Sequence, residues 1–153
     1  MRLTTYSDYA LRVLLYLALQ RGRLVTIQEI SDQYGISRNH LMKLVHELGR
    51  NGFVETVRGK NGGLRLGPDP ARIRVGDVIR VTEKDMDLVE CFQAGNDACR
   101  IATACALTGV LHGALGAFMA VLDQHTLADL VGPPARRARM AALFPQDPQE
   151  TPA

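Results

Sequence analysis

The chain has 153 residues, a net charge of +2 and a hydrophobic fraction of 46%. This length suits one domain or two small ones, and the apolar content is too high for a disordered protein. No uninterrupted apolar run reaches the ~18 residues that a membrane-spanning helix needs, and no small-residue cleavage site follows the N-terminal apolar stretch. We therefore expect a cytoplasmic protein.

Charge is distributed unevenly along the chain. Residues 1–66 contain ten Lys or Arg and five Asp or Glu, a net charge of +5, whereas the remainder contains eight basic and eleven acidic residues, a net charge of −3. A basic half joined to an acidic half is typical of a nucleic-acid-binding head attached to a regulatory or assembly part.

The first two predicted helices lie in the basic half. One spans residues 7–20, where Ser7 can cap the N-terminus and apolar residues recur at i, i+3, i+4 and i+7. The next begins at Thr26, which has Glu29 three residues later, the spacing of a capping box.

A tight turn at Gly35 then leads into a third helix, which Ser37 caps and which extends to about Leu48. A short helix, a glycine turn and a capped helix with a polar outer face form the pattern of a helix-turn-helix. Two short strand-like runs follow at residues 53–57 and 64–66, separated by a glycine-rich segment, which predicts a β-hairpin. A hairpin directly after a helix-turn-helix is a wing.

The rest of the chain predicts a short helix over 75–81 with Ile79 facing inward, a loop over 85–105, a long helix over 106–123 and a short helix over 127–131. From residue 132 the composition turns to Pro, Arg and Gln, so we expect a mostly disordered tail with at most one helical turn over 139–144. The predicted divisions are a winged helix-turn-helix head (1–68), a loop and long helix (69–131) and the tail (132–153).

The long helix carries Gly109, Gly113 and Gly116 on or near its apolar stripe. Each glycine costs roughly 1 kcal/mol of helix propensity, a cost that close packing against a second helix would offset. The fold class predicted is therefore mainly α with a small β wing, with a winged helix-turn-helix head and a long dimerisation helix.

Candidate DNA contacts lie on the third helix and on the wing. A recognition helix reads the major groove with the side chains of its N-terminal turns, and Arg and Asn can pair bidentately with guanine and adenine. Basic residues on a glycine-rich wing tip can approach phosphates or enter the minor groove. The candidate residues are Ser37, Arg38, Asn39, His40, Lys43, Arg58, Lys60 and Asn61.

Three cysteines, Cys91, Cys99 and Cys105, have the spacing C-x7-C-x5-C. In a cytosolic protein such a group favours metal binding or redox chemistry over disulfides. Iron–sulfur clusters are held by thiolates, with another ligand at one position in some proteins, whereas structural zinc sites favour close C-x(2–4)-C pairs. Spacing alone leaves a cluster, a thiol switch and unligated cysteines as alternatives.

Taken together, these blocks resemble the Rrf2 family of winged-helix regulators over residues 1 to about 131. The resemblance is greatest to the nitric-oxide-sensing repressors of that family in Ser37–His40 and Arg58–Gly63. The blocks that carry it are Leu3-Thr4, Tyr6–Arg12, Ser37–Leu41, Val57–Gly63, the three-cysteine loop and Leu127–Leu130.

The resemblance implies a homodimer that binds double-stranded DNA at a pseudo-palindromic operator. It implies an iron–sulfur cluster, 2Fe–2S or 4Fe–4S, on the three cysteines, with Asp8 of the partner chain as fourth ligand. It also implies that nitric oxide attacks the cluster and that the repressor then leaves DNA. From its position alone, Asp8 would simply complement the dipole of the first helix.

Other branches of the family offer an alternative, a regulator of iron–sulfur or redox homeostasis that uses the same cysteines. The branch that controls cluster biogenesis has a histidine ligand two residues after the third cysteine, where this chain has Leu107; the nearest later histidine, His112, is expected to pack between subunits. The C-x7 first spacing is also longer than the family's usual five. A plain winged-helix protein with a zinc or thiol switch is a further alternative. No nucleophile motif, phosphate loop or paired-carboxylate site suggests an enzyme.

Overall fold

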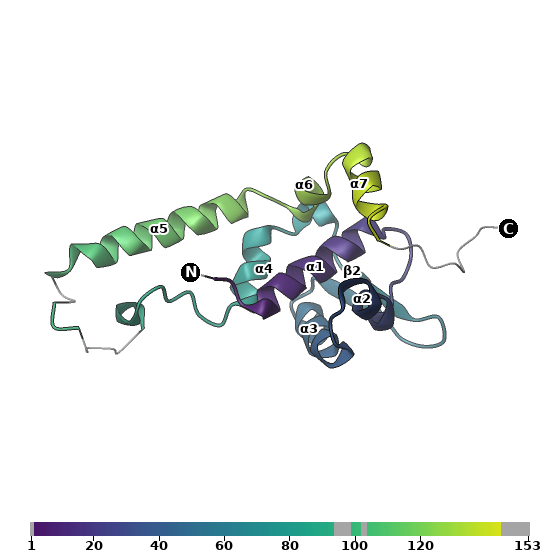
Figure 1. Cartoon of the computed structure of the whole chain (residues 1–153), viewed down its shortest axis with the longest axis horizontal. Helices are drawn as coiled ribbons and strands as arrows, with labels where there is room; N and C mark the ends of the chain where they lie inside the picture. The colour runs from purple at the N-terminus through teal and green to yellow at the C-terminus, as the bar shows by residue number, and fades with distance from the viewer. Residues whose placement is uncertain (1, 94–98, 102–103, 145–153) are drawn as a thin grey trace.

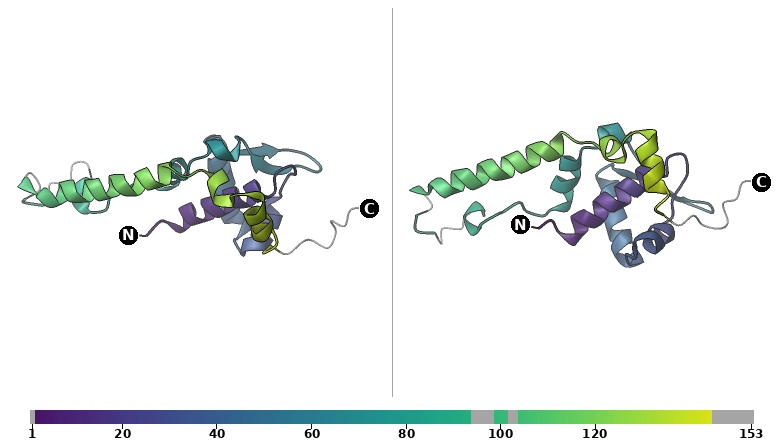
Figure 2. Two further views of the ribbon diagram at one scale, coloured as in Figure 1. Left: turned by 90° about the horizontal axis from the view of Figure 1, so that it is seen from above. Right: turned by 45° about the horizontal axis from the view of Figure 1, so that its top comes forward.

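Helices make up most of the protein, and a two-stranded antiparallel sheet completes it, as predicted. The computed structural model describes residues 2–93, 99–101 and 104–144. One helix, α5 (Ala106–Asp123), projects from a head formed by most other elements (Figure 1), and two further views show the same arrangement (Figure 2). The head contains α1 (Thr5–Leu19), α2 (Ile27–Tyr34), α3 (Arg38–Arg50), β1 (Val54–Val57), β2 (Gly63–Leu66), η1 (Pro70–Arg72), α4 (Val75–Thr82), α6 (Leu127–Val131) and α7 (Pro134–Ala141), and η2 (Glu90–Phe92) lies between α4 and α5.

Helix α1 is capped by Thr4, whose hydroxyl accepts a hydrogen bond from the backbone N–H of Ser7 at 3.2 Å. The prediction that Ser7 is the cap is wrong. Ser7 is fully buried inside the helix, and its hydroxyl is within 2.8 Å of the hydroxyl of Thr82 and 2.5 Å of a carboxylate oxygen of Glu83. The start of α1 is therefore fixed to the end of α4.

The helix-turn-helix is confirmed. Thr26 caps α2 by accepting from the N–H of Glu29, and Gly35 ends the helix with a φ of 64°, a left-handed conformation that glycine adopts without steric cost. Ser37 caps α3, as predicted. The Glu29 side chain also bonds the backbone of Thr26, as the predicted capping box requires, and it accepts further hydrogen bonds from Tyr16 and Arg23.

The wing is a hairpin in which Val54 pairs with Leu66 and Val57 with Gly63. A short bridge adds Val25 to the same sheet, since its N–H donates to the Leu64 carbonyl at 2.9 Å and its carbonyl accepts from the Leu64 N–H at 2.7 Å. The wing is thus attached to the segment between α1 and α2.

The core unites the helix-turn-helix with elements beyond residue 68. Leu14 and Leu44 are buried together with Ile73, Val78 and Leu127 in one hydrophobic cluster. Ile79 is fully buried on α4, as predicted. Segments 70–82 and 127–131 therefore belong structurally to the head, and α5 lies outside its core.

Helix α5 has the predicted bounds and buries none of its 18 residues. Its large apolar side chains Leu107, Val110 and Val121 are more than half exposed, and nothing in the described chain lies within 4 Å of a Cβ placed on Gly109. By length and composition alone, this helix could cross a membrane. It contacts the head through α4, where Arg80 makes a two-pronged ion pair with Asp123 at 2.7 and 2.6 Å.

The tail differs from the sequence prediction of disorder from residue 132. Residues Pro134–Ala141 form α7, which contacts α1 and α6, and the ring of Phe144 packs against the core. Proline at the first helical position favours this start, because its fixed φ suits a helix and its missing N–H is not needed there. Residues 145–153 of the predicted tail lie outside the described residues.

Candidate functional site

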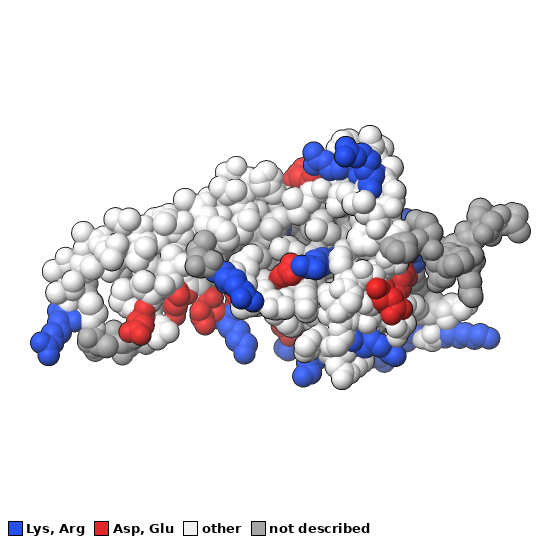
Figure 3. All heavy atoms as spheres, in the orientation of Figure 1, with Lys and Arg blue, Asp and Glu red and all other residues white. Residues whose placement is uncertain are grey.

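The predicted DNA-contacting side chains lie on two exposed features of the head. Ser37, Arg38, Asn39, His40 and Lys43 are exposed along the first turns of α3, and Arg58, Lys60 and Asn61 are exposed at the wing tip. Lys and Arg lie along the lower edge of the head, at the tip of the wing and also at the top of the head over α7, whereas the surface of α5 carries few charges in this view (Figure 3).

The charges on these features are available to a ligand. In the part of the chain that the structure describes, Arg38, Lys43, Arg58 and Lys60 form no ion pair. By contrast, Arg65 on the same hairpin is paired with Glu55 at 2.8 Å. Unpaired cations on protruding elements suit contact with phosphates.

The backbone conformation of the wing tip accounts for the glycines in its sequence. Gly59 has a φ of 108° and Asn61 a φ of 71°, so the chain turns sharply between the two strands. At Gly62 a Cβ would lie 2.3 Å from the carbonyl oxygen of Val57, so no larger residue fits without a shift of the backbone. This tight turn presents Arg58 and Lys60 at the end of the hairpin.

The three cysteines form no disulfide with one another and lie in the segment that precedes α5. Cys91 is in η2, Cys99 is exposed, and Cys105 is the N-cap residue of α5. Residues 94–98 and 102–103 of this loop lie outside the described residues.

Two of these cysteines, Cys91 and Cys105, contact Thr108. The sulfur of Cys91 lies 3.9 Å from the Thr108 hydroxyl. Hydrogen bonds from the backbone N–H groups of Thr108 and Leu107, together with one from the Thr108 hydroxyl, lower the pKa of Cys105. The first turn of α5 therefore favours the thiolate form of Cys105, which is the form that binds metal.

The donor set fits an iron–sulfur cluster, because all three sulfurs are free thiols and two of them approach the same residue. They do not form a complete ligand cage, since among the described residues no three His, Cys, Asp or Glu side chains converge. Asp8, the predicted fourth ligand, is on α1 and pairs with Arg12 at 2.8 Å.

Sequence reasoning missed two residues around this loop. Thr108 contacts two cysteines, and Glu83 joins the start of the loop to α1. His112, which is expected to pack between subunits, stacks its ring on Phe92 within the single chain. The only available signal was that Thr108 and His112 follow Cys105 within the first two turns of a predicted helix.

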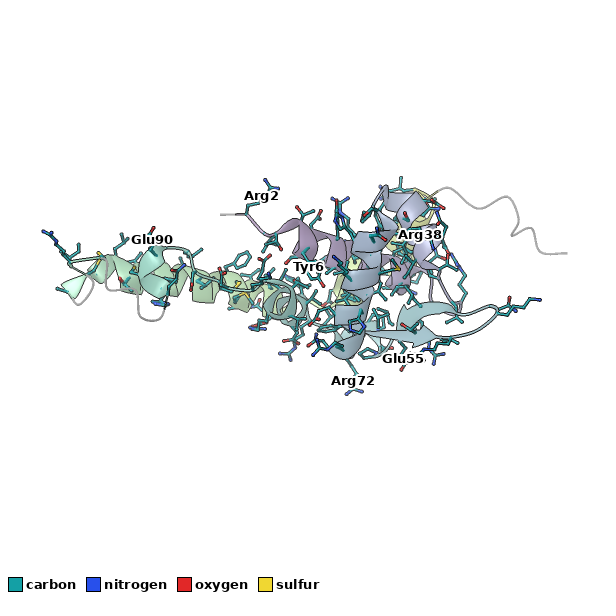
Figure 4. The ribbon with its side chains drawn as sticks, turned by 90° about the horizontal axis from the view of Figure 1, so that it is seen from below. Arg2, Tyr6, Arg38, Glu55, Arg72 and Glu90 are labelled. Atoms are coloured by element: carbon teal, nitrogen blue, oxygen red, sulfur yellow. The ribbon has the colours of Figure 1, made fainter. Side chains whose placement is uncertain are left out.

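The candidate DNA-contacting residues and the cysteine loop lie at different ends of the molecule. Figure 4 labels Arg38 in the helix-turn-helix and Glu90, the neighbour of Cys91, far apart along the long axis. Helix α1 lies between them, contacting α3 on one side and α4 on the other.

Comparisons with known proteins agree with this architecture. The Rrf2 family, described as "Iron-dependent Transcriptional regulator", matches residues 3–133. The chain is 53% identical over 132 residues to the "HTH-type transcriptional regulator NsrR" of Bacillus subtilis, covering 86% of this chain and 90% of that protein. The NsrR of Geobacillus kaustophilus is 50% identical over the same length, with the same two shares.

Two solved structures have the same fold. The IscR of T. potens has a TM-score of 0.71 and 26% identity, covering 96% of this chain and 94% of that one. The global cysteine regulator CymR of B. subtilis has a TM-score of 0.69 and 30% identity, covering 85% of this chain and 95% of that one. With the family match spanning most of its length, the chain belongs to the Rrf2 family of transcriptional regulators.

Proposed function

We propose that the protein is a cytoplasmic, dimeric repressor that binds a pseudo-palindromic DNA operator and senses nitric oxide through an iron–sulfur cluster. Cys91, Cys99 and Cys105 hold the cluster, and Asp8 of the partner chain completes its ligands. The observation that carries this proposal is the approach of Cys91 and Cys105 to Thr108, in a chain about half identical to NsrR proteins.

The DNA part of the proposal rests on the unpaired cations of α3 and the wing. Arg38 and Asn39 have the side chains that read guanine and adenine in the major groove, and Arg58 and Lys60 suit the flanking backbone. Two such heads related by twofold symmetry would read two half-sites roughly one or two helical turns apart.

Dimerisation is proposed to cover α5. An exposed apolar helix of this length needs a partner surface or a lipid phase, and Gly109, Gly113 and Gly116 leave room on one side of it for a close-packed helix. A second copy of α5 supplies such a surface in a protein whose head binds DNA, so a membrane location is not needed.

The cluster would supply iron that reacts with nitric oxide. The chain's own residues would carry the response to DNA through α1. Glu83, which directly precedes the cysteine loop, accepts hydrogen bonds from the N–H of Thr4 at 2.8 Å and from the Ser7 hydroxyl at 2.5 Å. Asp8, which would ligate the cluster of the partner chain, lies one residue further along α1, so a change at either cluster would reach the helix that packs on α3.

Anaerobic purification followed by Mössbauer spectroscopy tests the proposal. We expect brown protein with a cluster signal, loss of that signal on adding nitric oxide, and release of a duplex selected by the protein from a random DNA pool. Asp8→Ala should change the spectrum or the response to the gas, and Asp32→Ala on the exposed face of α2 is its control. Colourless protein with stoichiometric zinc, or DNA binding that is unaffected by nitric oxide, would contradict the proposal.

A further inference from the structure

Helix α7 and the residues after it lie beyond the family match, which ends at residue 133. Here α7 contacts α1 and α6, and three residues after its end the side chain of Phe144 turns back onto the head. In Figure 1 α7 lies at the top of the head and α3 at the bottom, so this segment approaches from the side away from the recognition helix.

Phe144 completes a cluster of three aromatic rings. Its ring lies edge-on to Tyr16 at a centroid distance of 5.0 Å and to Tyr34 at 5.5 Å, with interplanar angles of 81° and 75°. The two tyrosines also meet edge-on, at 6.0 Å. Edge-to-face pairs at these distances are attractive and depend on geometry, so each ring restricts the positions of the other two.

The two tyrosines join α1 to both ends of α2. Tyr16 on α1 donates its hydroxyl to Glu29 in the first turn of α2 at 2.6 Å. Burial and this hydrogen bond raise the pKa of Tyr16, so the phenol remains a donor. Tyr34 is the last residue of α2, and its hydroxyl donates to the backbone carbonyl of Arg12 on α1 at 3.4 Å.

The recognition helix follows directly from this junction. Gly35 comes immediately after Tyr34, and the carbonyl of Ile36 accepts a hydrogen bond from the Ser31 hydroxyl at 2.6 Å. Ile36 is buried, and Ser37 then caps α3. Because the turn is held to α2 in this way, a rotation of α2 against α1 also moves the start of α3.

We propose that Phe144 is a positioning residue for DNA recognition: it packs against Tyr16 and Tyr34 and so fixes α2, the turn and the N-terminal end of α3 relative to α1. Phe144 packs on the core through Tyr16 and Tyr34, so we expect no contact between its side chain and DNA. Sequence-specific binding depends on the angle at which α3 enters the groove, whereas non-specific binding depends on phosphate charge. Loss of Phe144 should therefore reduce specific binding selectively.

The test uses full-length Phe144→Ala and Phe144→Leu, with Leu143→Ala as matched control because Leu143 is 82% exposed. All variants are prepared with the same cluster content and oxidation state as the wild-type protein that selects the specific duplex. Affinities are measured for that duplex and for a scrambled duplex of equal length, at one salt concentration. NMR spectra of the Tyr16 and Tyr34 ring protons report whether the cluster has changed.

We expect Phe144→Ala to lower affinity for the selected duplex about tenfold and to leave affinity for the scrambled duplex within about twofold, with shifted tyrosine signals. Phe144→Leu should lie between Phe144→Ala and the wild type. Unchanged specific affinity would overturn the proposal, as would an equal loss on both duplexes, which would indicate general damage to the head. Should Phe144→Ala unfold at the assay temperature, the two affinities of Phe144→Leu decide by the same criteria.

Discussion

The imidazole ring of His112 lies parallel to the phenyl ring of Phe92, with 3.8 Å between centroids and 5° between planes. Phe92 directly follows Cys91, and His112 is one turn beyond Thr108, which contacts the Cys91 sulfur. These two contacts hold η2 against the first turns of α5. These contacts position Cys91 beside the first turns of α5 in the chain without a bound ligand.

This stacking predicts the accessibility of Cys91. His112→Ala should speed alkylation of Cys91 in metal-free, reduced protein by about twofold to fivefold, because a stacked pair of this kind is worth roughly 0.5–1 kcal/mol. His112→Phe should preserve the wild-type rate, and His46→Ala on the exposed side of α3 is a control. Peptide mass spectrometry of timed iodoacetamide reactions measures the rates; equal rates in all four proteins would show that the stacking does not restrain η2.

The Glu83 network predicts a loss of stability. Glu83→Gln removes the charge that accepts from Thr4 and Ser7, so the free energy of unfolding at neutral pH should fall by ~1–2 kcal/mol. Urea unfolding followed by circular dichroism measures the change. Lys84→Gln, an exposed neighbour, should have little effect.

The same network predicts a pH dependence. Burial raises the pKa of Glu83, but hydrogen bonds from Ser7 and Thr4 outweigh it, so the pKa lies below its ordinary value. A depressed carboxyl pKa contributes stability above the ordinary value, and that contribution disappears as the pH falls through the folded-state pKa. The difference in unfolding free energy between wild type and Glu83→Gln should therefore shrink on acidification; a constant difference from pH 7 to pH 3 would contradict this reasoning.

The wing predicts a uniform effect on DNA binding. Arg58→Ala should weaken binding to selected and scrambled duplexes alike and reduce the salt slope of the binding constant by about one, as expected for a lost phosphate contact. Arg65→Ala on the same hairpin is the matched control, because Glu55 already neutralises Arg65. Gel shifts at several salt concentrations measure both quantities. A loss confined to the selected duplex would instead indicate that Arg58 reads a base or the minor groove.

The exposed face of α5 predicts the oligomeric state. Val110→Glu places a charge where the side chain is 66% exposed, so it should leave the fold of the single chain intact and raise the dimer dissociation constant about 100-fold. Sedimentation velocity measures the association, and circular dichroism the helix content. Leu143→Glu, also at an exposed site but outside α5, should remain dimeric. Dimers that persist in Val110→Glu would place the subunit interface elsewhere.

Local sequence signals predicted most of the fold. The bounds of α5 and α6 follow from apolar periodicity and from Thr126, whose hydroxyl and backbone both bond Asp129 in a capping box. Gly35 and Ser37 predicted the turn and the start of α3, because a helix C-cap and an N-cap depend only on residues close to them in the sequence. The exposed candidate DNA contacts were predicted from the same local pattern.

What the sequence did not predict depends on distant contacts. Both Thr4 and Ser7 can cap a helix, and the choice involves Glu83, 79 and 76 residues away. Phe144 packs on Tyr16 and Tyr34 more than 100 residues before it, which composition cannot reveal. Thr108 and His112 likewise gain their roles only where α5 meets η2.

The attachment of α5 to the head has a mechanical consequence. The helix meets the head near its C-terminal end, where Asp123 bonds Arg80, and its other end begins at Cys105. Its 18 residues make a lever about 27 Å long, so a tilt of only about 5° at the pivot displaces the thiol end by about 2 Å. Small rearrangements at one end of this arm are thereby magnified at the other.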